Sequence, residues 1–262
     1  MQSIRFAARY LSYYLKAVDE HSLHSPLIYD LYHNVIQNEL LNPYYASIEN
    51  ERDFLLAIDQ AIELNDLGAG TSNAVLKSRK ISDIARKSIA PAKKSRLLHR
   101  LINYCKPNTV LELGTCLGIN TLYLALEETI SEVYTFEGCH NTATVAKNLW
   151  QKFDFASKIN LVEGNIDNTL LHLISELKQI DFAFMDANHT YEATMEYFEA
   201  IEEKVHHQSM VVIDDIHWSS GMQKAWKEIK QRDSVFLSID LFHVGIILFK
   251  PLYIKQHYIL EF

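Results

Sequence analysis

Apolar and polar positions follow two different patterns on either side of residue 95. Beyond it, short apolar runs typical of buried strands alternate with segments whose apolar residues recur every three or four positions, as in helices. After a first strand that includes Val110, Leu111 and Leu113, further strands are predicted at 132–137, 159–164, 180–186, 209–214, 234–239 and 243–249. This alternation predicts a mostly parallel sheet covered by helices on both faces.

The last two predicted strands stand apart from this scheme. Only about three residues, Asp240 to Phe242, join them. A parallel crossover needs a dozen or more residues, so these strands must form an antiparallel hairpin.

Residues 1–94 have the pattern of helices and loops. Ile4, Ala8, Leu11 and Leu15 follow helical spacing, and Ser25-Pro26 has the form of a helix start. Apolar positions from Phe54 to Ile62 predict a third helix. We therefore predict an N-terminal helical cap over 1–94 and a second domain over 95–262.

Composition narrows the classes of function. The chain has 262 residues and a formal net charge of −8, so there is no overall basic surface for nucleic acid, and only 77–96 is strongly basic. Three scattered cysteines favour neither disulfides nor a thiolate metal site, and a reducing cytoplasm fits them best. No apolar run approaches the ~20 residues that span a bilayer.

One stretch, Thr109–Ala125, joins a buried strand to a turn with Gly114 and Gly118 and then to an apolar helix. Glycines let backbone N–H groups approach a ligand, and a helix N-terminus adds positive partial charge, so the turn suits an adenosine-containing ligand. A second glycine-containing stretch, Asp66–Thr71, has residues of helical period before it and polar, basic residues after it. We interpret it as a loop without a cofactor.

Acidic residues end four of the first five predicted strands. In a sheet of this kind, ligands bind beyond the carboxyl ends of the strands. Glu137 ends the second strand, where a carboxylate can accept hydrogen bonds from ribose hydroxyls in nicotinamide enzymes and methyltransferases alike. The other acidic strand-end residues are Glu112, Asp186, Asp214 and Asp215.

These motifs together resemble the class I S-adenosylmethionine-dependent methyltransferases. The resemblance covers about 95–250 and rests on ELGTCLG from Glu112, on Glu137, on DANHTYE from Asp186, on IDDIHW from Ile213 and on the final hairpin. It is closest to metal-dependent small-molecule O-methyltransferases of the catechol type and their relatives. The resemblance implies a Rossmann-like α/β fold with seven strands and an antiparallel hairpin. It also implies an enzyme that methylates an oxygen of a small molecule.

The same resemblance implies the residues of the cofactor site. Asn165 and Ile166 follow the third strand, where the family contacts adenine largely through backbone and apolar surface. The residues implied to bind S-adenosylmethionine are Glu112, Gly114, Thr115, Gly118, Glu137, Asn165, Ile166 and Asp186.

A divalent cation such as Mg²⁺ is also implied, with Asp186, Asp214 and Asp215 as its ligands, since oxygen ligands suit this ion. Asp186 and His189 are the implied catalytic residues. His189 stands where catechol-type enzymes have a lysine, which leaves the identity of the base open. An imidazole could accept the hydroxyl proton or bind the metal, or it could cap the next helix or hydrogen-bond a carboxylate.

Three alternatives stay open. The first is a metal-independent methyltransferase whose basic 77–96 segment recruits a larger or anionic acceptor, such as a lipid, glycan or protein. The second is a protein that binds S-adenosylmethionine without catalysis. The third is a nicotinamide enzyme, which loses ground because Cys116 occupies the position of the middle glycine in G-x-G-x-x-G. The apolar N-terminal helix and the tail Tyr258–Leu260 could form a homodimer contact or complete a monomer.

Overall fold

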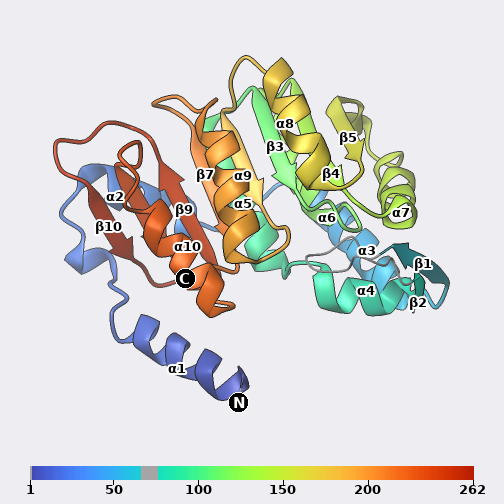
Figure 1. Ribbon diagram of the computed structural model, residues 1–262, viewed down its shortest axis with the longest axis horizontal. Coiled ribbons are helices and arrows are strands. Elements are labelled where there is room, and N and C mark those ends of the chain that lie inside the picture. Colours follow the sequence, from blue (N-terminus) through green and yellow to red (C-terminus); the bar gives the residue numbers. More distant parts are fainter. Residues whose placement is uncertain (1, 66–75) are drawn as a thin grey trace. The chain divides into compact units, whose positions relative to one another are not determined.

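The computed structural model describes residues 2–65 and 76–262 (Figure 1). The chain packs as two compact units, one formed by residues 1–38 with residues 176–262 and the other by residues 39–175. The stretch Asp66–Thr71, interpreted above as a loop, lies outside the described residues. The boundary between residues 94 and 95 stays a prediction.

Three parallel strands form the sheet of the unit 39–175, as the sequence predicts. They are β3 (Thr109–Leu113), β4 (Glu132–Glu137) and β5 (Ile159–Glu163). Leu111 lies opposite Tyr134, and Phe136 lies opposite Val162. The helices before, between and after these strands are α5 (Ala92–Cys105), α6 (Ile119–Leu124), α7 (His140–Trp150), the 3₁₀ helix η3 (Asp154–Lys158) and α8 (Ile166–Glu176). Figure 1 shows the three strands side by side.

The part of this unit before α5 differs from the prediction. Its elements are α3 (Tyr44–Ala57), β1 (Ala61–Asn65), β2 (Leu76–Lys80) and α4 (Ile81–Ser88). The predicted helix through Ile62 is wrong, because Ile62 and Leu64 are partly buried while Ala61 and Glu63 are exposed, which is the period of a strand.

The strands β1 and β2 form an antiparallel hairpin in which Ile62 lies opposite Arg79. A strand therefore does precede Asp66, and the argument that none does is wrong. The element that follows 66–75 is a second strand and not an apolar helix, so the strand–turn–helix context of a cofactor loop is still missing there.

An apolar cluster joins the hairpin to the rest of the unit 39–175. Buried Leu117, Leu122 and Trp150 belong to it, and the partly buried Ile62 and Leu64 of β1 pack against it. The side chains of α3 and α4 that complete it include Tyr45, Ile48, Leu55, Ile81 and Ile84. The hairpin is therefore held by the same core that supports the glycine turn.

The other unit contains the remaining four predicted strands and one further strand, in the order β10-β8-β9-β7-β6. They are β6 (Phe182–Met185), β7 (Met210–Asp214), β8 (Leu237–Asp240), β9 (Val244–Leu248) and β10 (Gln256–Ile259). β6 and β7 are parallel, and β9 is antiparallel to β7 and to β8, which confirms the predicted hairpin. β10 was not predicted; it adds an eighth strand to the seven expected, parallel to β8.

The helices of this unit are α1 (Gln2–Tyr14), the 3₁₀ helix η1 (Glu20–Ser22), α2 (Pro26–Leu31), the π-helix η2 (Tyr32–Ile36), α9 (Tyr191–Glu202) and α10 (Ser220–Ile229). The two chain ends are joined here, because Val18 bridges to Leu260 and the Tyr13 hydroxyl donates to the Leu260 carbonyl. Within the described part of the chain, no helix has the length and apolarity to cross a membrane.

Candidate active site

The glycine turn after β3 bends through backbone conformations that most residues avoid. Gly114 has φ of 102° and Gly118 has φ of 81°, which only glycine adopts freely. Cys116 between them has φ of 51°, so a non-glycine residue occupies the left-handed region. The amides of Gly114 and Thr115 donate to the Phe136 carbonyl at 3.2 and 2.9 Å, which ties the turn to β4.

Gly118 is required by packing within the protein as well as by its backbone conformation. A Cβ atom at this position would lie 2.5 Å from Nε1 of Trp150 on α7. That indole nitrogen donates to the Gly118 carbonyl at 2.9 Å. Part of the glycine pattern that indicates a cofactor loop therefore reflects the close approach of α7.

Glu112 is fully buried at the end of β3. Its carboxylate accepts hydrogen bonds from the hydroxyls of Thr121 at 2.5 Å and Thr135 at 2.6 Å, and Thr135 also pairs with the Thr115 hydroxyl. The group thus links β3 to α6, β4 and the glycine turn. This setting suits a residue that positions the turn, and the predicted cofactor contact of Glu112 remains a prediction.

Glu137 has a different setting, half-buried at the end of β4. Its Oε2 atom accepts the Cys116 amide at 2.8 Å, and its Oε1 atom accepts the Cys139 amide at 2.9 Å. Burial raises the pKa of Glu137, and the hydrogen bonds from Cys139, Thr142 and Cys116 partly offset this rise. Additional hydroxyl donors, such as those of a ribose, would compensate the buried charge further.

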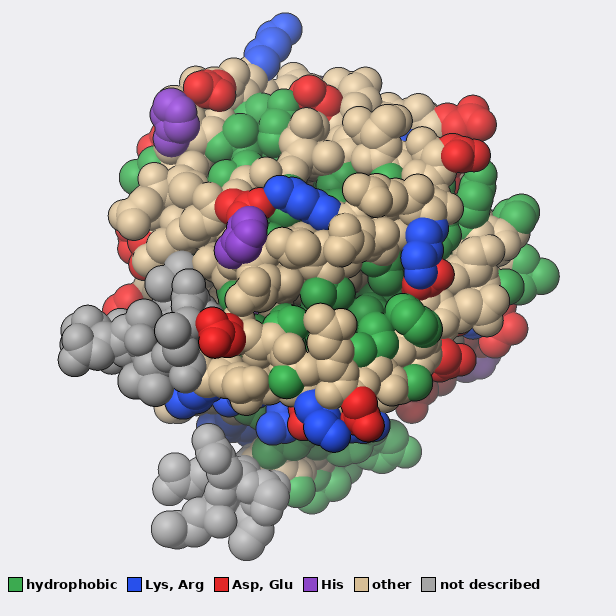
Figure 2. All heavy atoms as spheres, turned by 90° about the vertical axis from the view of Figure 1, so that its right-hand side faces the viewer, with side chains coloured by type: hydrophobic (Ala, Val, Ile, Leu, Met, Phe, Trp, Pro, Cys, Tyr) green, Lys and Arg blue, Asp and Glu red, His purple; other side chains and the backbone are tan. Residues whose placement is uncertain are grey.

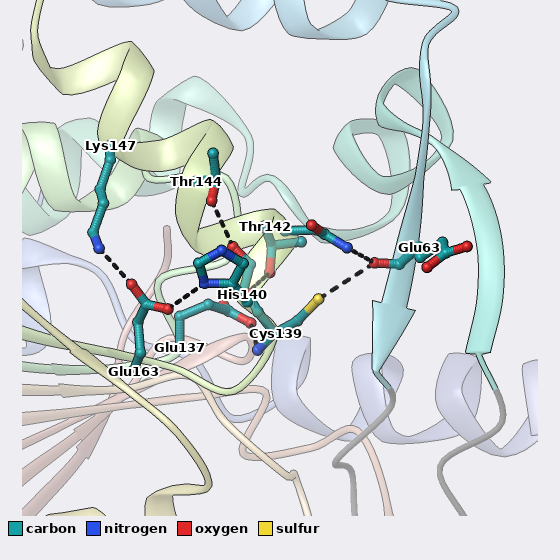
Figure 3. A network of polar contacts seen from close by, with 9 residues as sticks. Glu63, Glu137, Cys139, His140, Thr142, Thr144, Lys147 and Glu163 are labelled. Atoms are coloured by element: carbon teal, nitrogen blue, oxygen red, sulfur yellow. Dashed lines mark hydrogen bonds and ion pairs between the residues drawn. The ribbon is translucent and has the colours of Figure 1, made fainter.

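The N-terminus of α7 holds several polar contacts around Glu137 (Figure 3). His140 Nδ1 lies 2.7 Å from Glu163 Oε2, and Lys147 pairs with the other oxygen of Glu163. On the opposite side, the Glu63 carbonyl of β1 accepts Nδ2 of Asn141 and the thiol of Cys139. The hairpin therefore adjoins the strand end that carries Glu137.

Asn165 and Ile166 begin α8 beside Gly164, whose amide donates to the Glu137 carbonyl at 2.9 Å. The Asn165 side chain accepts the Asp167 amide at 3.1 Å, and Ile166 is buried. The ends of β3, β4 and β5 thus lie side by side in the sheet. Besides the buried Glu112, six of the predicted cofactor residues lie at or directly after these strand ends: Gly114, Thr115, Gly118, Glu137, Asn165 and Ile166.

The other unit carries the predicted catalytic residues in the turn after β6. Nε2 of His189 lies 3.3 Å from Oδ1 of Asp186. Asn188 and His189 have φ of 60° and 42°, so two consecutive non-glycine residues adopt left-handed conformations. Such strain persists only where the surroundings enforce it, and it occurs often at functional sites. Asn188 is held by a hydrogen bond to the Tyr197 hydroxyl at 2.5 Å.

The charge state of His189 reflects its carboxylate neighbours. Burial lowers its pKa, but the hydrogen bond and charge of Asp186, with the charges of Asp215 and Asp214, outweigh burial, so the pKa is raised above its ordinary value. This pairing with Asp186 was one of the alternatives left open by the sequence.

The three predicted metal ligands do not form a common site. Asp214 is buried in β7, while Asp215 has φ of 52° and lies 4.0 Å from His243. In residues 2–65 and 76–262, no group of three or more His, Cys, Asp or Glu side chains is arranged to hold a metal ion. The side chains as placed therefore do not fit the implied cation.

His217 and Trp218 follow β7 but have partners elsewhere in the same unit. His217 Nε2 lies 2.8 Å from Asp240 Oδ2, and its ring stacks on Phe242. Trp218 is exposed, and its carbonyl accepts a hydrogen bond from Arg9 of α1 at 2.9 Å. These contacts support a structural role for His217.

Comparison with known proteins gives one family match, which covers part of the chain. Residues 111–216 match the model of a family described as a methyltransferase domain. No curated protein matches the sequence.

Solved structures give the same class at the level of the fold. The O-methyltransferase TomG of Streptomyces achromogenes, involved in tomaymycin synthesis and solved with S-adenosylmethionine, is 20% identical with a TM-score of 0.53, over 63% of this chain and 82% of its own. An O-methyltransferase of Bacillus cereus, solved with SAH, is 14% identical with a TM-score of 0.56, over 85% and 97%. A SAH-bound methyltransferase of Podospora anserina is 15% identical with a TM-score of 0.56, over 82% and 100%.

The Rossmann-like methyltransferase fold predicted from the sequence is thus confirmed, and the family match over residues 111–216 agrees with the predicted methyltransferase. At the site itself, the amide of Cys116 in the glycine turn donates to the carboxylate of Glu137, so the turn and this carboxylate lie side by side.

Two features of the site were not predicted. The first is the threonine pair Thr121 and Thr135 that binds Glu112. The second is the hairpin contact at Glu63, which uses the backbone carbonyl, so any residue type at position 63 could make it. The alternation in 61–65 was the available indication of a strand.

Proposed function

We propose that this chain transfers the methyl group of S-adenosylmethionine to a hydroxyl oxygen of a small molecule. The observation that carries the proposal is the hydrogen bond between the glycine turn and Glu137, in which the amide of Cys116 donates to the carboxylate. S-adenosylmethionine, when bound, supplies a methyl group on a positively charged sulfur. Glu137 is the residue proposed to accept hydrogen bonds from the ribose hydroxyls.

The residue proposed to accept the proton is His189. Methylation of a hydroxyl forms an O–C bond, breaks the S–C bond and releases the hydroxyl proton, which needs an acceptor. A neutral imidazole can take this proton at Nδ1, because Nε2 lies 3.3 Å from Oδ1 of Asp186, which orients the ring and stabilises the charged form. The left-handed backbone at 188–189 supports a role in function, since it fixes the ring direction at an energetic cost.

A divalent cation at Asp186, Asp214 and Asp215 was expected from the sequence. Because the three carboxylates do not form one group in the structure, no step of the proposal passes through a cation.

A larger anionic acceptor is the second candidate. Its support is the basic side chains that β2 and α4 carry. Figure 2, which shows the side of the molecule at the right of Figure 1, has Lys and Arg side chains along its lower edge. Lys80 already pairs with Asp59, and Arg86 pairs with Asp83. Exposed pairs of this kind leave less positive charge for a ligand, so the small-molecule acceptor is favoured.

The test is formation of S-adenosylhomocysteine from S-adenosylmethionine with a panel of phenols, catechols and aliphatic alcohols, measured by mass spectrometry. His189→Gln and Asp186→Asn should lower turnover by about 100-fold, the range of general-base catalysis, and His189→Gln should leave the affinity for S-adenosylhomocysteine unchanged. His207→Gln, at an exposed histidine of the same unit, is the matched control. Full activity of both variants would contradict the catalytic assignment, and cofactor binding without turnover would favour a non-catalytic protein.

A further inference from the structure

The hairpin of β1 and β2 is fastened to the start of α7 at one backbone atom. The Glu63 carbonyl accepts Nδ2 of Asn141 at 2.7 Å and the thiol of Cys139 at 3.7 Å (Figure 3). Both donors come from the first residues around the α7 N-terminus. Two side chains thus converge on a single carbonyl of an element that the fold class did not lead us to expect.

Cys139 connects this contact to the candidate cofactor site. Its amide donates to Oε1 of Glu137 at 2.9 Å, while its side chain donates to β1. The second oxygen of Glu137 accepts the amide of Cys116 in the glycine turn. Cys139 therefore contacts both the hairpin and the Glu137 carboxylate, and this carboxylate also contacts the glycine turn.

Apolar packing supports the same connection. Ile62 and Leu64 of β1 pack against the cluster that contains Leu117 of the glycine turn. Cys116, which also belongs to the turn, is partly buried and packs against the same cluster. Polar and apolar contacts therefore both place β1 against the elements that would hold the nucleoside.

We propose that β1, the described strand at Ala61–Asn65, forms part of the cofactor site and that Asn141 is the positioning residue that holds it there. The proposal rests on the proposed function, because the ligand is the nucleoside part of S-adenosylmethionine. Asn141 fixes the backbone of β1 at Glu63, and this fixes Cys139, whose amide orients the Glu137 carboxylate. Loss of the Asn141 donor loosens the hairpin and misplaces Glu137.

The first readout is the affinity of the full chain for S-adenosylhomocysteine, measured by calorimetry. Asn141→Asp keeps the shape of the side chain but removes the donor, and Asn141→Ala removes the group. Both should weaken binding about fivefold to tenfold, the range for one lost hydrogen bond, and should raise KM for S-adenosylmethionine without lowering kcat. Thr144→Ala is the control, because Thr144 is on the same helix and donates to the His140 carbonyl, away from the hairpin.

The second readout needs no cofactor turnover. Cys139 is buried, so its alkylation by iodoacetamide, followed by peptide mass spectrometry, should be slow in the wild type and faster in both Asn141 variants. Added S-adenosylhomocysteine should slow the reaction further in the wild type, and Thr144→Ala should behave as the wild type.

The outcomes separate this inference from the proposed function. A wild-type chain that binds no S-adenosylhomocysteine contradicts the proposed function itself. A wild type that binds, together with Asn141 variants that bind within twofold of it, overturns the role of the hairpin. Faster alkylation of Cys139 with unchanged affinity overturns it as well, because the hairpin would then be detached without effect on the site.

Discussion

The Glu112 carboxylate accepts the Thr135 hydroxyl at 2.6 Å, so the end of β3 is tied to β4 through two buried side chains. Thr121 of α6 donates to the same oxygen at 2.5 Å. A buried carboxylate that accepts hydrogen bonds from two hydroxyls stabilises the conformation of the glycine turn. Glu137, at the end of the neighbouring strand β4, is only half-buried, and it is the carboxylate that we propose as the ribose acceptor.

Substitution of these two glutamates should therefore give different results. Glu112→Gln replaces an acceptor oxygen with a donor nitrogen beside two hydroxyls, and we expect a loss of about 1–3 kcal/mol in the free energy of unfolding, measured in urea. Glu137→Gln should weaken the binding of S-adenosylhomocysteine roughly tenfold or more and cost less stability. A larger affinity loss in Glu112→Gln than in Glu137→Gln would show that the roles are reversed.

A second prediction concerns Gly118. An alanine there would be strained by the positive φ, and its Cβ would lie 2.5 Å from Nε1 of Trp150. We expect Gly118→Ala to lower the free energy of unfolding by about 2–4 kcal/mol. Gly221→Ala is the control, since its nearest contact would be 3.3 Å and no positive φ is involved. Equal losses for the two variants would contradict the argument.

Much of the fold could be predicted from the sequence. Seven of the strands after residue 108 are short, largely apolar segments between helices of clear period, and β4 was predicted with its observed bounds, whereas β10 was not predicted. The hairpin of β8 and β9 followed from the length of its connection. The hairpin of β1 and β2 was missed, because five residues such as 61–65 satisfy a helical and a strand period almost equally well.

The site divides in the same way. Glycines and strand-end carboxylates such as Glu137 have types and positions that indicate their chemistry. Contacts that use the backbone, such as the hydrogen bond from Asn141 to the Glu63 carbonyl, do not depend on the type of the residue whose carbonyl accepts. They could not be predicted from the sequence. The arrangement of Asp186, Asp214 and Asp215 depends on side-chain directions that spacing does not define.

The buried His99 predicts a pH dependence of stability. Its Nδ1 atom lies 2.7 Å from the Tyr45 hydroxyl, and its Nε2 atom lies 2.7 Å from Glu127 Oε1. Burial lowers its pKa, with Glu127 opposing this effect. Because the unfolded chain then binds a proton more readily than the folded one, stability should be full above about pH 6.5 and should fall as pH drops below that value.

The measurement is the free energy of unfolding between pH 7.5 and pH 5. His99→Gln should reduce the slope of this loss, whereas His21→Gln, at an exposed histidine, should keep the wild-type slope. A variant at position 99 with an unchanged slope would show that other groups cause the acid sensitivity.

Removal of divalent cations tests the predicted metal. Because no group of three suitable side chains forms within the described residues, EDTA should leave the rate of S-adenosylhomocysteine formation within about twofold of the untreated rate. Activity that EDTA abolishes and Mg²⁺ restores would instead establish the cation at Asp186, Asp214 and Asp215 that the sequence implies.

The central claim is that the turn at 114–118 and Glu137 bind S-adenosylmethionine. Calorimetric titration of the purified chain with S-adenosylmethionine and, separately, with NADH tests it most directly. We predict saturable binding of S-adenosylmethionine at one site per chain, weakened in Glu137→Gln, and no binding of NADH. Binding of NADH, or no binding of S-adenosylmethionine by the folded wild type, would contradict the claim.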